Sequence, residues 1–254
     1  MRLICLNTWG GNAGIEDLLA FFRHHQKIDI FCLQEIHTDG AESVGLRVTP
    51  DQTLDNIEPE LLRRIEEVLP EHQTLFMPLW KAQYGQVIFV KKGIEVLETA
   101  EWAVYRERGY LSPHVIADHA RLIQCVWLNT KEGPVAVLNL HGLWNGQGKE
   151  DSEDRLEQSR RTLAFIEQLD VPFILAGDLN LGLETESLKM LEAAGLRNLV
   201  REYGIPSTRT RFYKKSDPFA DYVLTSAGIR VEDFQALPDE VSDHAALCLD
   251  FSLE

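Results

Sequence analysis

Two apolar patterns alternate along this chain. Short uninterrupted apolar runs, bounded by polar or glycine-bearing segments, predict β-strands. We expect these strands at residues 3–6, 28–33, 74–78, 87–91, 123–128, 135–140, 173–176, 222–224 and 246–251. Between them lie stretches in which apolar residues recur every three or four positions, the spacing of one face of an α-helix.

This helical spacing is found at residues 15–22, 57–69, 152–169 and 187–194. In the second stretch, Pro59 lies near the expected first turn, where its missing N–H costs nothing. In the fourth, Thr185 is a candidate N-cap and Gly195 a candidate stop. The residues of the third helix that we expect to face inward are Leu156, Leu163, Ile166 and Leu169.

The order of these elements indicates either two layers of sheet covered by helices or one sheet covered on both faces. Periodicity does not choose between the two. No Gly/Ser-rich or Pro-rich linker, internal repeat or low-complexity tract divides the sequence. A length of 254 residues is near the upper limit for one hydrophobic core. We therefore expect a single domain over residues 1–254.

The net charge limits the classes of molecule that the protein is expected to bind. The formal net charge of −15 argues against a broad nucleic-acid surface, because phosphate backbones are held by clustered Lys and Arg. A small phosphate pocket is compatible with this charge, since a bound divalent cation can reverse the local field. The sequence contains no apolar stretch of membrane-spanning length and no signal-peptide pattern at its N-terminus. We expect a monomeric cytoplasmic protein.

The cysteines agree with that compartment. Cys5, Cys32, Cys125 and Cys248 each sit alone inside an apolar run, and none belongs to a C-x-x-C pair. Buried free thiols in core strands explain this pattern better than a zinc site or a disulfide framework. Disulfides between neighbouring strands are the alternative that the sequence leaves open.

Several apolar runs end in carboxylate, amide or imidazole side chains, which are Asn7, Glu35, His141, Asp178 and Asn180. A fifth unit reverses this order, because Asp243 and His244 precede the apolar run 245–251. Strand ends at one sheet edge are where α/β folds build sites. If the last strand is antiparallel to its neighbours, its N-terminal end reaches the same edge.

Spacing adds detail to these strand ends. Asp178 and Asn180 are two residues apart, so in extended chain both side chains leave the same face. Gly177 is expected to let the backbone approach whatever they bind. Asp243 and His244 would point in opposite directions in a regular strand. Both can serve one site only from a loop that precedes the strand.

These residues belong to six ordered motifs that resemble the series of the endonuclease/exonuclease/phosphatase superfamily. The motifs are Leu-Asn-Thr-Trp at 6–9, Leu-Gln-Glu at 33–35, Asn-Leu-His at 139–141, Gly-Asp-Leu-Asn at 177–180, Ala-Asp-Tyr-Val at 220–223 and Ser-Asp-His at 242–244. The resemblance implies an α+β fold, a four-layer α/β/β/α sandwich of two mixed sheets flanked by helices. It also implies a divalent metal, usually Mg²⁺, with Mn²⁺ as a second candidate.

The resemblance further implies a ligand set and a catalytic set. Glu35 would be the principal metal ligand, assisted by Asn7 and Asp243. Magnesium prefers oxygen ligands and keeps several waters, so two carboxylates and an amide are sufficient.

In the catalytic set, Asp178 would orient or deprotonate the attacking water, and Asn180 would hold the water or a phosphate oxygen. His141 and His244 would bind the phosphate and stabilise its charge. Asp221 would orient His244, because a His–Asp pair fixes the imidazole tautomer and favours its cationic form.

Each residue taken alone has a simpler explanation. Asn7 and Asp178 suit turns that follow strands, Asp243 could cap a local turn, and Glu35 could be a solvated charge. His141 alone would more often be a satisfied polar residue at the core edge. The occurrence of all six motifs in order favours the functional interpretation.

His141 places the chain within the superfamily. Abasic-site endonucleases carry Asn-x-Tyr where this chain has Asn-Leu-His, and the histidine form resembles pancreatic-type deoxyribonucleases, sphingomyelinases and many bacterial phosphodiesterases. In deoxyribonucleases a Glu partners this histidine. The matching stretch here, Tyr84-Gly85-Gln86, has no acid, so the partner of His141 is left open.

The long segment 142–155 after His141 could form a wall of a cleft. Trp144 is a candidate to enclose substrate, and Lys149 and Arg155 are candidates to contact phosphate. The alternative is that Trp144 packs under the loop and Arg155 pairs with nearby acids. Further basic residues that the sequence does not assign are Arg106, Arg108, Arg121, Arg209 and Arg211.

The leading hypothesis is a metal-dependent phosphodiesterase or phosphatase acting on a small or lipid-like phosphoester. The first alternative is an endo- or exonuclease cleaving DNA or RNA, which the acidic charge does not favour. The second is a binding module without activity, which the intact motifs do not favour.

Overall fold

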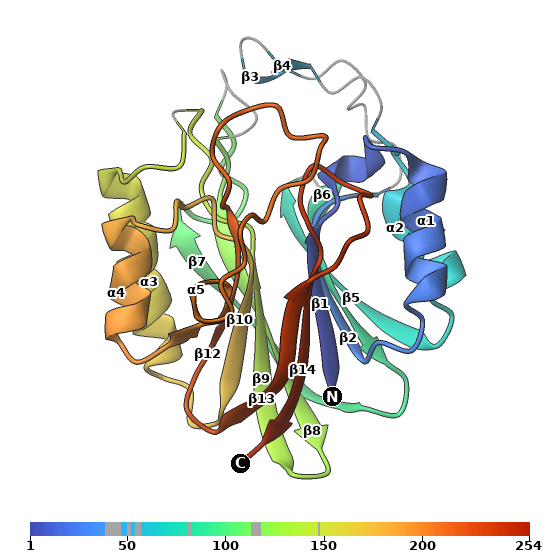
Figure 1. Cartoon of the computed structure of the whole chain (residues 1–254), viewed down its shortest axis with the longest axis vertical. Helices are drawn as coiled ribbons and strands as arrows, with labels where there is room; N and C mark the ends of the chain where they lie inside the picture. The colour runs from blue at the N-terminus through green and yellow to red at the C-terminus, as the bar shows by residue number, and fades with distance from the viewer. Residues whose placement is uncertain (39–46, 50–51, 54–56, 81–82, 113–117, 147) are drawn as a thin grey trace.

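The computed structural model of the chain describes residues 1–38, 47–49, 52–53, 57–80, 83–112, 118–146 and 148–254. Within these residues, two six-stranded sheets pack face to face in the middle of the molecule. Helices α1 (Ile15–His24) and α2 (Leu61–Val68) lie outside one sheet, and α3 (Glu153–Ile166) and α4 (Glu186–Ala193) lie outside the other (Figure 1). This is the four-layer α/β/β/α sandwich that the motifs imply. None of the described helices combines the length and apolar character needed to cross a bilayer.

The first sheet has the order β13-β14-β1-β2-β6-β5. Its strands are β13 (Ile229–Ala236), β14 (Leu247–Leu253), β1 (Arg2–Asn7), β2 (Ile30–His37), β6 (Tyr84–Lys91) and β5 (His72–Trp80). Strands β1 and β2 run parallel, whereas the other neighbours are antiparallel. The last strand, β14, is antiparallel to β1, as the sequence requires if Asp243 and His244 are to reach the edge where β1 ends.

The second sheet has the order β11-β12-β10-β9-β8-β7. Its strands are β11 (Arg197–Asn198), β12 (Asp221–Thr225), β10 (Phe173–Asp178), β9 (Gly133–Leu140), β8 (Arg121–Thr130) and β7 (Glu95–Tyr105). Here β9 and β10 form the parallel pair. Each sheet therefore has one parallel pair at its centre, and β1 and β2 pack across the core against β10. The remaining elements are η1 (Trp9–Gly11), β3 (Arg47–Thr49), β4 (Gln52–Thr53) and α5 (Leu199–Glu202).

All of the strands expected from apolar runs are present, most of them longer than the run itself. Strands β7 and β13 were not expected from the sequence. Both are edge strands in which most side chains are exposed or half-buried. An edge strand with a solvated face carries charges that keep it from pairing with other chains, so it lacks the apolar run that identifies a central strand.

The helices differ from expectation in two respects. Helix α2 begins at Leu61, so Pro59 lies before the helix and not in its first turn. Helix α3 ends at Ile166, and its expected inward-facing leucines, Leu156, Leu163 and Leu169, are all only half-buried. Its buried face is instead largely polar, comprising Arg155, Gln158, Ser159, Thr162, Phe165 and Ile166. Two of these polar groups hold the preceding loop: Arg155, as described below, and Gln158, whose Oε1 accepts a hydrogen bond from the backbone N–H of Leu143.

Helix α4 begins and ends where the sequence predicts. The Thr185 hydroxyl accepts a hydrogen bond from the backbone N–H of Leu188, which satisfies one of the unpaired donors of the first turn. Gly195 follows the helix with φ of 94°, a left-handed conformation that glycine adopts at helix ends without steric cost.

Apolar side chains of both sheets fill the space between them, and a second apolar cluster lies between the first sheet and helices α1 and α2. Cys5, Cys32, Cys125 and Cys248 are buried and free, as expected. The core thus fixes the two parallel pairs relative to each other, and with them the polar residues at the strand ends.

Candidate active site

The site begins where the central strands end. Asn7 is the last residue of β1, Asp178 is the last residue of β10, and His141 directly follows β9. In the sheet register, Asp178 lies opposite Asp221 of β12. The parallel pairs of the two sheets end at the same side of the sandwich (Figure 1). The side chains that follow them therefore converge from both sheets, as the contact between Asn7 and Asp178 shows.

Glu35 lies inside β2 in an unusual backbone conformation. Its φ is 58°, and the register between β2 and β6 shifts between Leu33 and Ile36. A bulge of this kind re-aims a side chain, and a left-handed non-glycine residue inside a strand is strained unless its surroundings fix it. Here Asn7 fixes it, since Asn7 Nδ2 donates to Glu35 Oε1 at 3.0 Å.

The same amide group also reaches the second sheet, because Asn7 Nδ2 lies 3.0 Å from Asp178 Oδ2. Asp178 is surrounded by both histidines: His141 Nε2 and His244 Nε2 each lie 3.7 Å from its Oδ2. His141 Nε2 is also 3.8 Å from Glu35 Oε1. The structure therefore brings together Asn7, Glu35, His141, Asp178 and His244 around one point.

Asn180 joins this group in a way that a regular strand does not provide. It follows the end of β10 with φ of 56°, so the chain has already turned. Its backbone N–H donates to Asp178 Oδ1 at 2.9 Å, and its Nδ2 donates to the carbonyl of Gly142 at 3.1 Å. Asn180 thus reaches the site by a turn, and the expectation that both side chains leave one face of an extended strand was wrong.

Gly177 is required by the packing of two strands. A Cβ atom at this position would lie 1.9 Å from the carbonyl oxygen of Leu140. Glycine is therefore needed because β10 approaches the end of β9 closely, and its expected role in the approach of a ligand stays a prediction.

The carboxyl of Asp178 is charged in this setting. Burial raises its pKa, but His244, Lys149, His141 and Arg209 outweigh burial and hold the pKa well below the usual range. A permanently ionised carboxylate can accept a hydrogen bond or a proton from a water molecule beside it.

His244 lies between a carboxylate and a guanidinium. Its Nδ1 lies 2.8 and 2.9 Å from the two oxygens of Asp221, and its Nε2 lies 2.6 Å from Arg209 Nη1. Asp243 precedes it in the loop before β14, with Oδ1 3.6 Å from His244 Nε2. Burial and Arg209 lower the pKa of His244, but Asp221, Asp243 and Asp178 raise it overall. The two adjacent residues serve one site from a loop, as expected.

His141 has a phenol in place of an acid as its partner. Tyr84 Oη lies 3.3 Å from His141 Nδ1, and Gln86 Oε1 accepts a hydrogen bond from the His141 backbone N–H at 3.0 Å. Burial, followed by the charge of Arg121, holds the pKa of His141 well below its ordinary value. The stretch Tyr84-Gly85-Gln86 therefore does contact His141, through groups that carry no charge.

The carboxylates of this site form a donor set suited to a hard divalent cation. The Oδ1 atom of Asp243 is buried and accepts no hydrogen bond from the described residues. Burial raises the pKa of Glu35, Asn7 and His244 lower it, and Asp243 and Asp178 raise it further. Carboxylates that destabilise one another's charge in this way are stabilised by a cation that takes oxygen ligands.

A second donor set is conceivable, since Asp178, Asp221 and His244 offer ligand atoms within 4.8 Å of one another. Both oxygens of Asp221 contact His244 Nδ1, however, so Asp221 orients the imidazole. Glu35 and Asp243, the carboxylates that the motifs imply as ligands, stay the predicted donors. Asn7 donates through its nitrogen, and its Oδ1 accepts from the N–H of Trp9, so in this arrangement it orients the carboxylates. Its role as a ligand stays a prediction.

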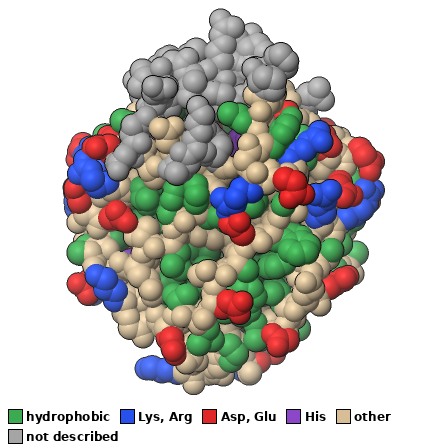
Figure 2. Space-filling model, turned by 180° about the vertical axis from the view of Figure 1, so that it is seen from behind, with side chains coloured by type: hydrophobic (Ala, Val, Ile, Leu, Met, Phe, Trp, Pro, Cys, Tyr) green, Lys and Arg blue, Asp and Glu red, His purple; other side chains and the backbone are tan. Residues whose placement is uncertain are grey.

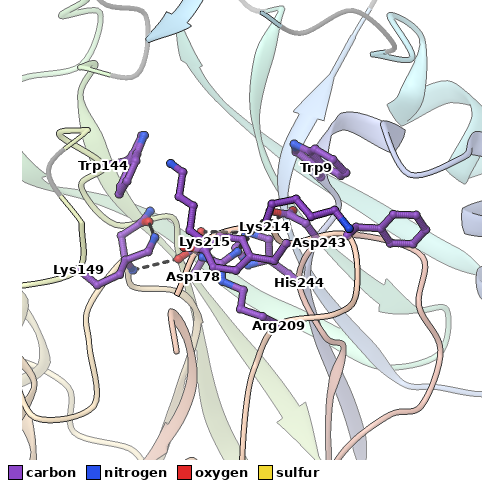
Figure 3. A pocket seen from close by; sticks show the side chains of 12 residues that line it. Trp9, Trp144, Lys149, Asp178, Arg209, Lys214, Lys215, Asp243 and His244 are labelled. Carbon is purple, nitrogen blue, oxygen red and sulfur yellow. Dashed lines mark hydrogen bonds and ion pairs between the residues drawn. The ribbon is translucent and has the colours of Figure 1, made fainter. Parts of the chain in front are cut away.

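A cavity of about 250 Å³ opens beside Asp178, Asn180 and His244. Trp144 and Lys149 line it, on the opposite side from Trp9 (Figure 3). Lys149 is buried and its ammonium contacts Asn180 Oδ1. Both candidates for substrate contact are thus placed at the cavity.

Arg155 is not placed there. It is 1 % exposed, and its guanidinium donates to the carbonyls of Glu150 and Gly148, the latter at 2.6 Å, and to Asn145 Oδ1 at 3.4 Å. Arg155 therefore holds the loop before α3 in shape. Neither the expected phosphate contact nor the alternative of pairing with acids describes these contacts.

One wall of the cavity was not expected from the sequence. The segment between Arg209 and Lys215 supplies cations and aromatic rings, and the lining residues it contributes are Arg209, Phe212, Tyr213, Lys214 and Lys215. The signal available was Arg-Thr-Arg-Phe-Tyr-Lys-Lys at 209–215, a basic and aromatic stretch in an acidic chain. Of the other unassigned arginines, Arg121 is buried within β8 and Arg108 contacts Glu101.

Comparison with known proteins agrees with this geometry. A sequence model described as the Endonuclease/Exonuclease/phosphatase family matches residues 4–244. No curated protein matches the chain significantly. Mannosyl-6-phosphatase from Bacteroides thetaiotaomicron VPI-5482 superposes with a TM-score of 0.74 at 16% identity, covering 100% of this chain and 100% of its own.

Two further solved structures are similar. The human Nocturnin catalytic domain has a TM-score of 0.67 at 19% identity and covers 100% of this chain and 93% of its own. ANGEL2, described as a 2',3'-cyclic phosphatase, has a TM-score of 0.71 at 16% identity and covers 98% and 94%. At such identities the likeness shows a shared fold.

Proposed function

The chain belongs to the endonuclease/exonuclease/phosphatase family, and from this we propose that it is a divalent-metal-dependent phosphoester hydrolase acting on a small substrate. The observation that carries the proposal is the convergence of Asn7, Glu35, His141, Asp178 and His244 around one point beside a cavity. Fold alone would not assign an activity, whereas this set of groups matches one reaction.

Glu35 and Asp243 would hold the metal, for which Mg²⁺ is the leading candidate. When bound, the cation would stabilise the negative charge that builds on phosphate oxygens during hydrolysis. Asn7 positions the carboxylate of Glu35 and keeps it apart from that of Asp178.

Asp178 would orient the attacking water and accept its proton. It is anionic, it is 2 % exposed, and the N–H of Asn180 fixes its Oδ1. A carboxylate held by two neighbouring donors presents its remaining electron pairs in a fixed direction. This fixes the line of attack on phosphorus.

His244, Arg209 and Lys149 would bind the phosphate. Arg209 Nη1 lies 2.6 Å from His244 Nε2 and donates to it when the imidazole is neutral; an anionic oxygen placed before them would accept hydrogen bonds from Arg209 and from protonated His244. Asp221 favours the cationic form of His244. Charge-assisted donors fixed before the reaction stabilise the charge of the transition state.

A small substrate is favoured over nucleic acid by the distribution of charge. The basic residues that line the cavity, Lys149, Arg209, Lys214 and Lys215, gather at one opening. On the back of the molecule Lys and Arg side chains are interspersed with Asp and Glu (Figure 2). A duplex or long strand requires a continuous basic track. Names of similar structures include a sugar phosphatase and a cyclic phosphatase, which supports a small phosphoester for this chain.

Turnover of an aryl phosphomonoester and an aryl phosphodiester with Mg²⁺ or Mn²⁺ tests the proposal. We expect hydrolysis of at least one of these two esters. A chelator should abolish this hydrolysis, and added metal should restore it. Glu35→Gln should raise the metal concentration for half-maximal rate, while Glu66→Gln, an exposed change on α2, should leave it unchanged. If the folded protein shows no metal-dependent turnover of the monoester, the diester or plasmid DNA, the proposal is contradicted.

A further inference from the structure

The cavity carries a feature that hydrolysis of the phosphate itself does not require. Two ammonium groups contact one indole: Lys149 Nζ lies 4.6 Å and Lys215 Nζ 4.8 Å from the ring centroid of Trp144. Lys149 comes from the loop before α3, and Lys215 comes from the loop between α5 and β12. Figure 3 shows both side chains on the side of the cavity where Trp144 lies.

These cations have no acidic partner in the described part of the chain. Although the sequence contains 40 acidic and 25 basic residues, no carboxylate there forms an ion pair with Lys149, Lys214 or Lys215. Lys149 is 4 % exposed and contacts the neutral amide of Asn180. Lys214 donates to the carbonyl of Arg211 at 2.8 Å. Lys149 is balanced in part by the nearby Asp178 carboxylate, whereas Lys215 is exposed with no described carboxylate at ion-pair distance, so its ammonium is available to an anion that enters the cavity.

Position distinguishes two parts of the cavity. Asp178, Asn180 and His244 line one part, where the phosphate would react. Trp144 and Lys215 line the same opening and contact each other there. A substrate whose phosphorus sits before Asp178 has room to place its leaving group, or the rest of the ester, along Trp144 and Lys215.

We propose that Trp144 and Lys215 form a binding site for a negatively charged leaving group, with Lys149 between this site and the reacting phosphate. The site deepens the proposed function and rests on it. The indole supplies a flat apolar face for a ring, and the ammonium groups pair with an anionic substituent such as a second phosphate or a carboxylate. The substrate class is a small, doubly anionic organic phosphoester.

The test compares two nearly isosteric esters, 4-carboxyphenyl phosphate and 4-carbamoylphenyl phosphate. For each enzyme the ratio of kcat/KM for the anionic ester to that for the neutral ester is measured, and comparison with the native enzyme cancels intrinsic leaving-group effects. A charge-assisted contact predicts that the ratio falls about tenfold in Lys215→Ala and further in Lys215→Glu. Lys131→Glu, in the exposed turn between β8 and β9 at the far end of β9, is the matched control and should keep the native ratio.

A binding measurement separates this proposal from the proposed function. Calorimetry with the same two esters and the Asp178→Asn protein should show tighter binding of the carboxylate, and adding Lys215→Ala should remove the difference. If the native enzyme hydrolyses neither ester but this binding order is found, the anionic site stands and the phosphatase activity fails. Hydrolysis with the same ratio in native and Lys215→Ala enzymes would overturn the anionic site and leave the activity standing. Equal or absent binding of both esters would overturn it as well.

Discussion

At the scale of single residues, Asp178 occupies the centre of the site because groups from both sheets contact it. Asn7 reaches it from β1, and His141 and His244 approach the same carboxylate oxygen. The cations around it keep it ionised despite burial. A substitution at Asp178 should therefore test the charge of this side chain as well as its shape.

Asp178→Asn keeps the shape and removes the charge. Because general-base groups contribute about 10²- to 10⁴-fold to rate, kcat should fall by about that factor on any ester that the native enzyme hydrolyses. Steady-state kinetics at saturating metal measures this. Asp170→Asn, an exposed change after α3, is the control. Native-like kcat in Asp178→Asn would show that the reacting water lies elsewhere.

Tyr84 provides the second test at this scale. Tyr84→Phe removes the hydroxyl that lies 3.3 Å from His141 Nδ1 and keeps the ring. Loss of one neutral hydrogen bond is worth about 1 kcal/mol, which predicts a fall of about fivefold in kcat/KM with little change in melting temperature. The effect should appear in kcat if the phenol positions His141 for the transition state. An unchanged kcat/KM would mean that Gln86 and the backbone suffice to hold the imidazole.

At the scale of secondary-structure elements, the site depends on how closely β10 approaches the end of β9. Gly177 makes this approach possible, since a Cβ there would lie 1.9 Å from Leu140 O. The same backbone contact sets the distance between His141, which follows β9, and Asp178, which ends β10. Strand packing and reaction geometry are coupled at this one position.

Gly177→Ala should therefore impair both stability and activity. Forcing backbone apart in a packed core costs about 1–3 kcal/mol or more, which denaturant unfolding measures. Gly182→Ala is a matched control, because its Cβ would meet its nearest neighbours at an ordinary 3.6 Å. If Gly177→Ala unfolds at the native midpoint, the close approach is not rigid and the coupling is refuted.

At the scale of the whole molecule, burial lowers the pKa of histidines outside the site as well. His72 begins β5, and its Nε2 lies 2.8 Å from the carbonyl oxygen of Ile28. Burial lowers its pKa from 6.5, and the hydrogen bond to Ile28 opposes this only in part. Between its folded pKa and 6.5 the unfolded chain binds more protons than the folded chain, so the stability that neutral His72 contributes is present above pH 6.5 and is lost as pH falls.

The free energy of unfolding of the native protein should thus fall more steeply from pH 7.5 to 5.5 than that of His72→Gln. Glutamine can still donate to Ile28 O and does not titrate. Measuring both proteins at both pH values isolates His72, because the changes in overall charge are shared. Parallel slopes would show that His72 titrates alike in folded and unfolded chains.

Much of this molecule could be predicted from its sequence. Central strands carry apolar runs because both of their faces are buried, so β1, β2, β9 and β10 were identified together with the polar residues at their ends. The edge strands β7 and β13 were missed because a solvated face carries no such run. The motif residues that meet at the site were identified for the same reason, since each immediately follows or precedes a recognisable strand.

Other features depended on contacts between residues far apart in the chain. The left-handed conformation of Glu35, the phenol beside His141 and the loop-holding role of Arg155 each follow from groups that the sequence does not pair. Lys215 meets Trp144, and the segment 209–215 lines the same cavity, only because two loops from different parts of the second sheet close over one edge. Local pattern determined the elements and the chemistry at their ends, since propensity and burial act over a few neighbouring residues. Tertiary packing alone decided which charges face each other, because Coulomb interaction and steric contact depend on distance in space.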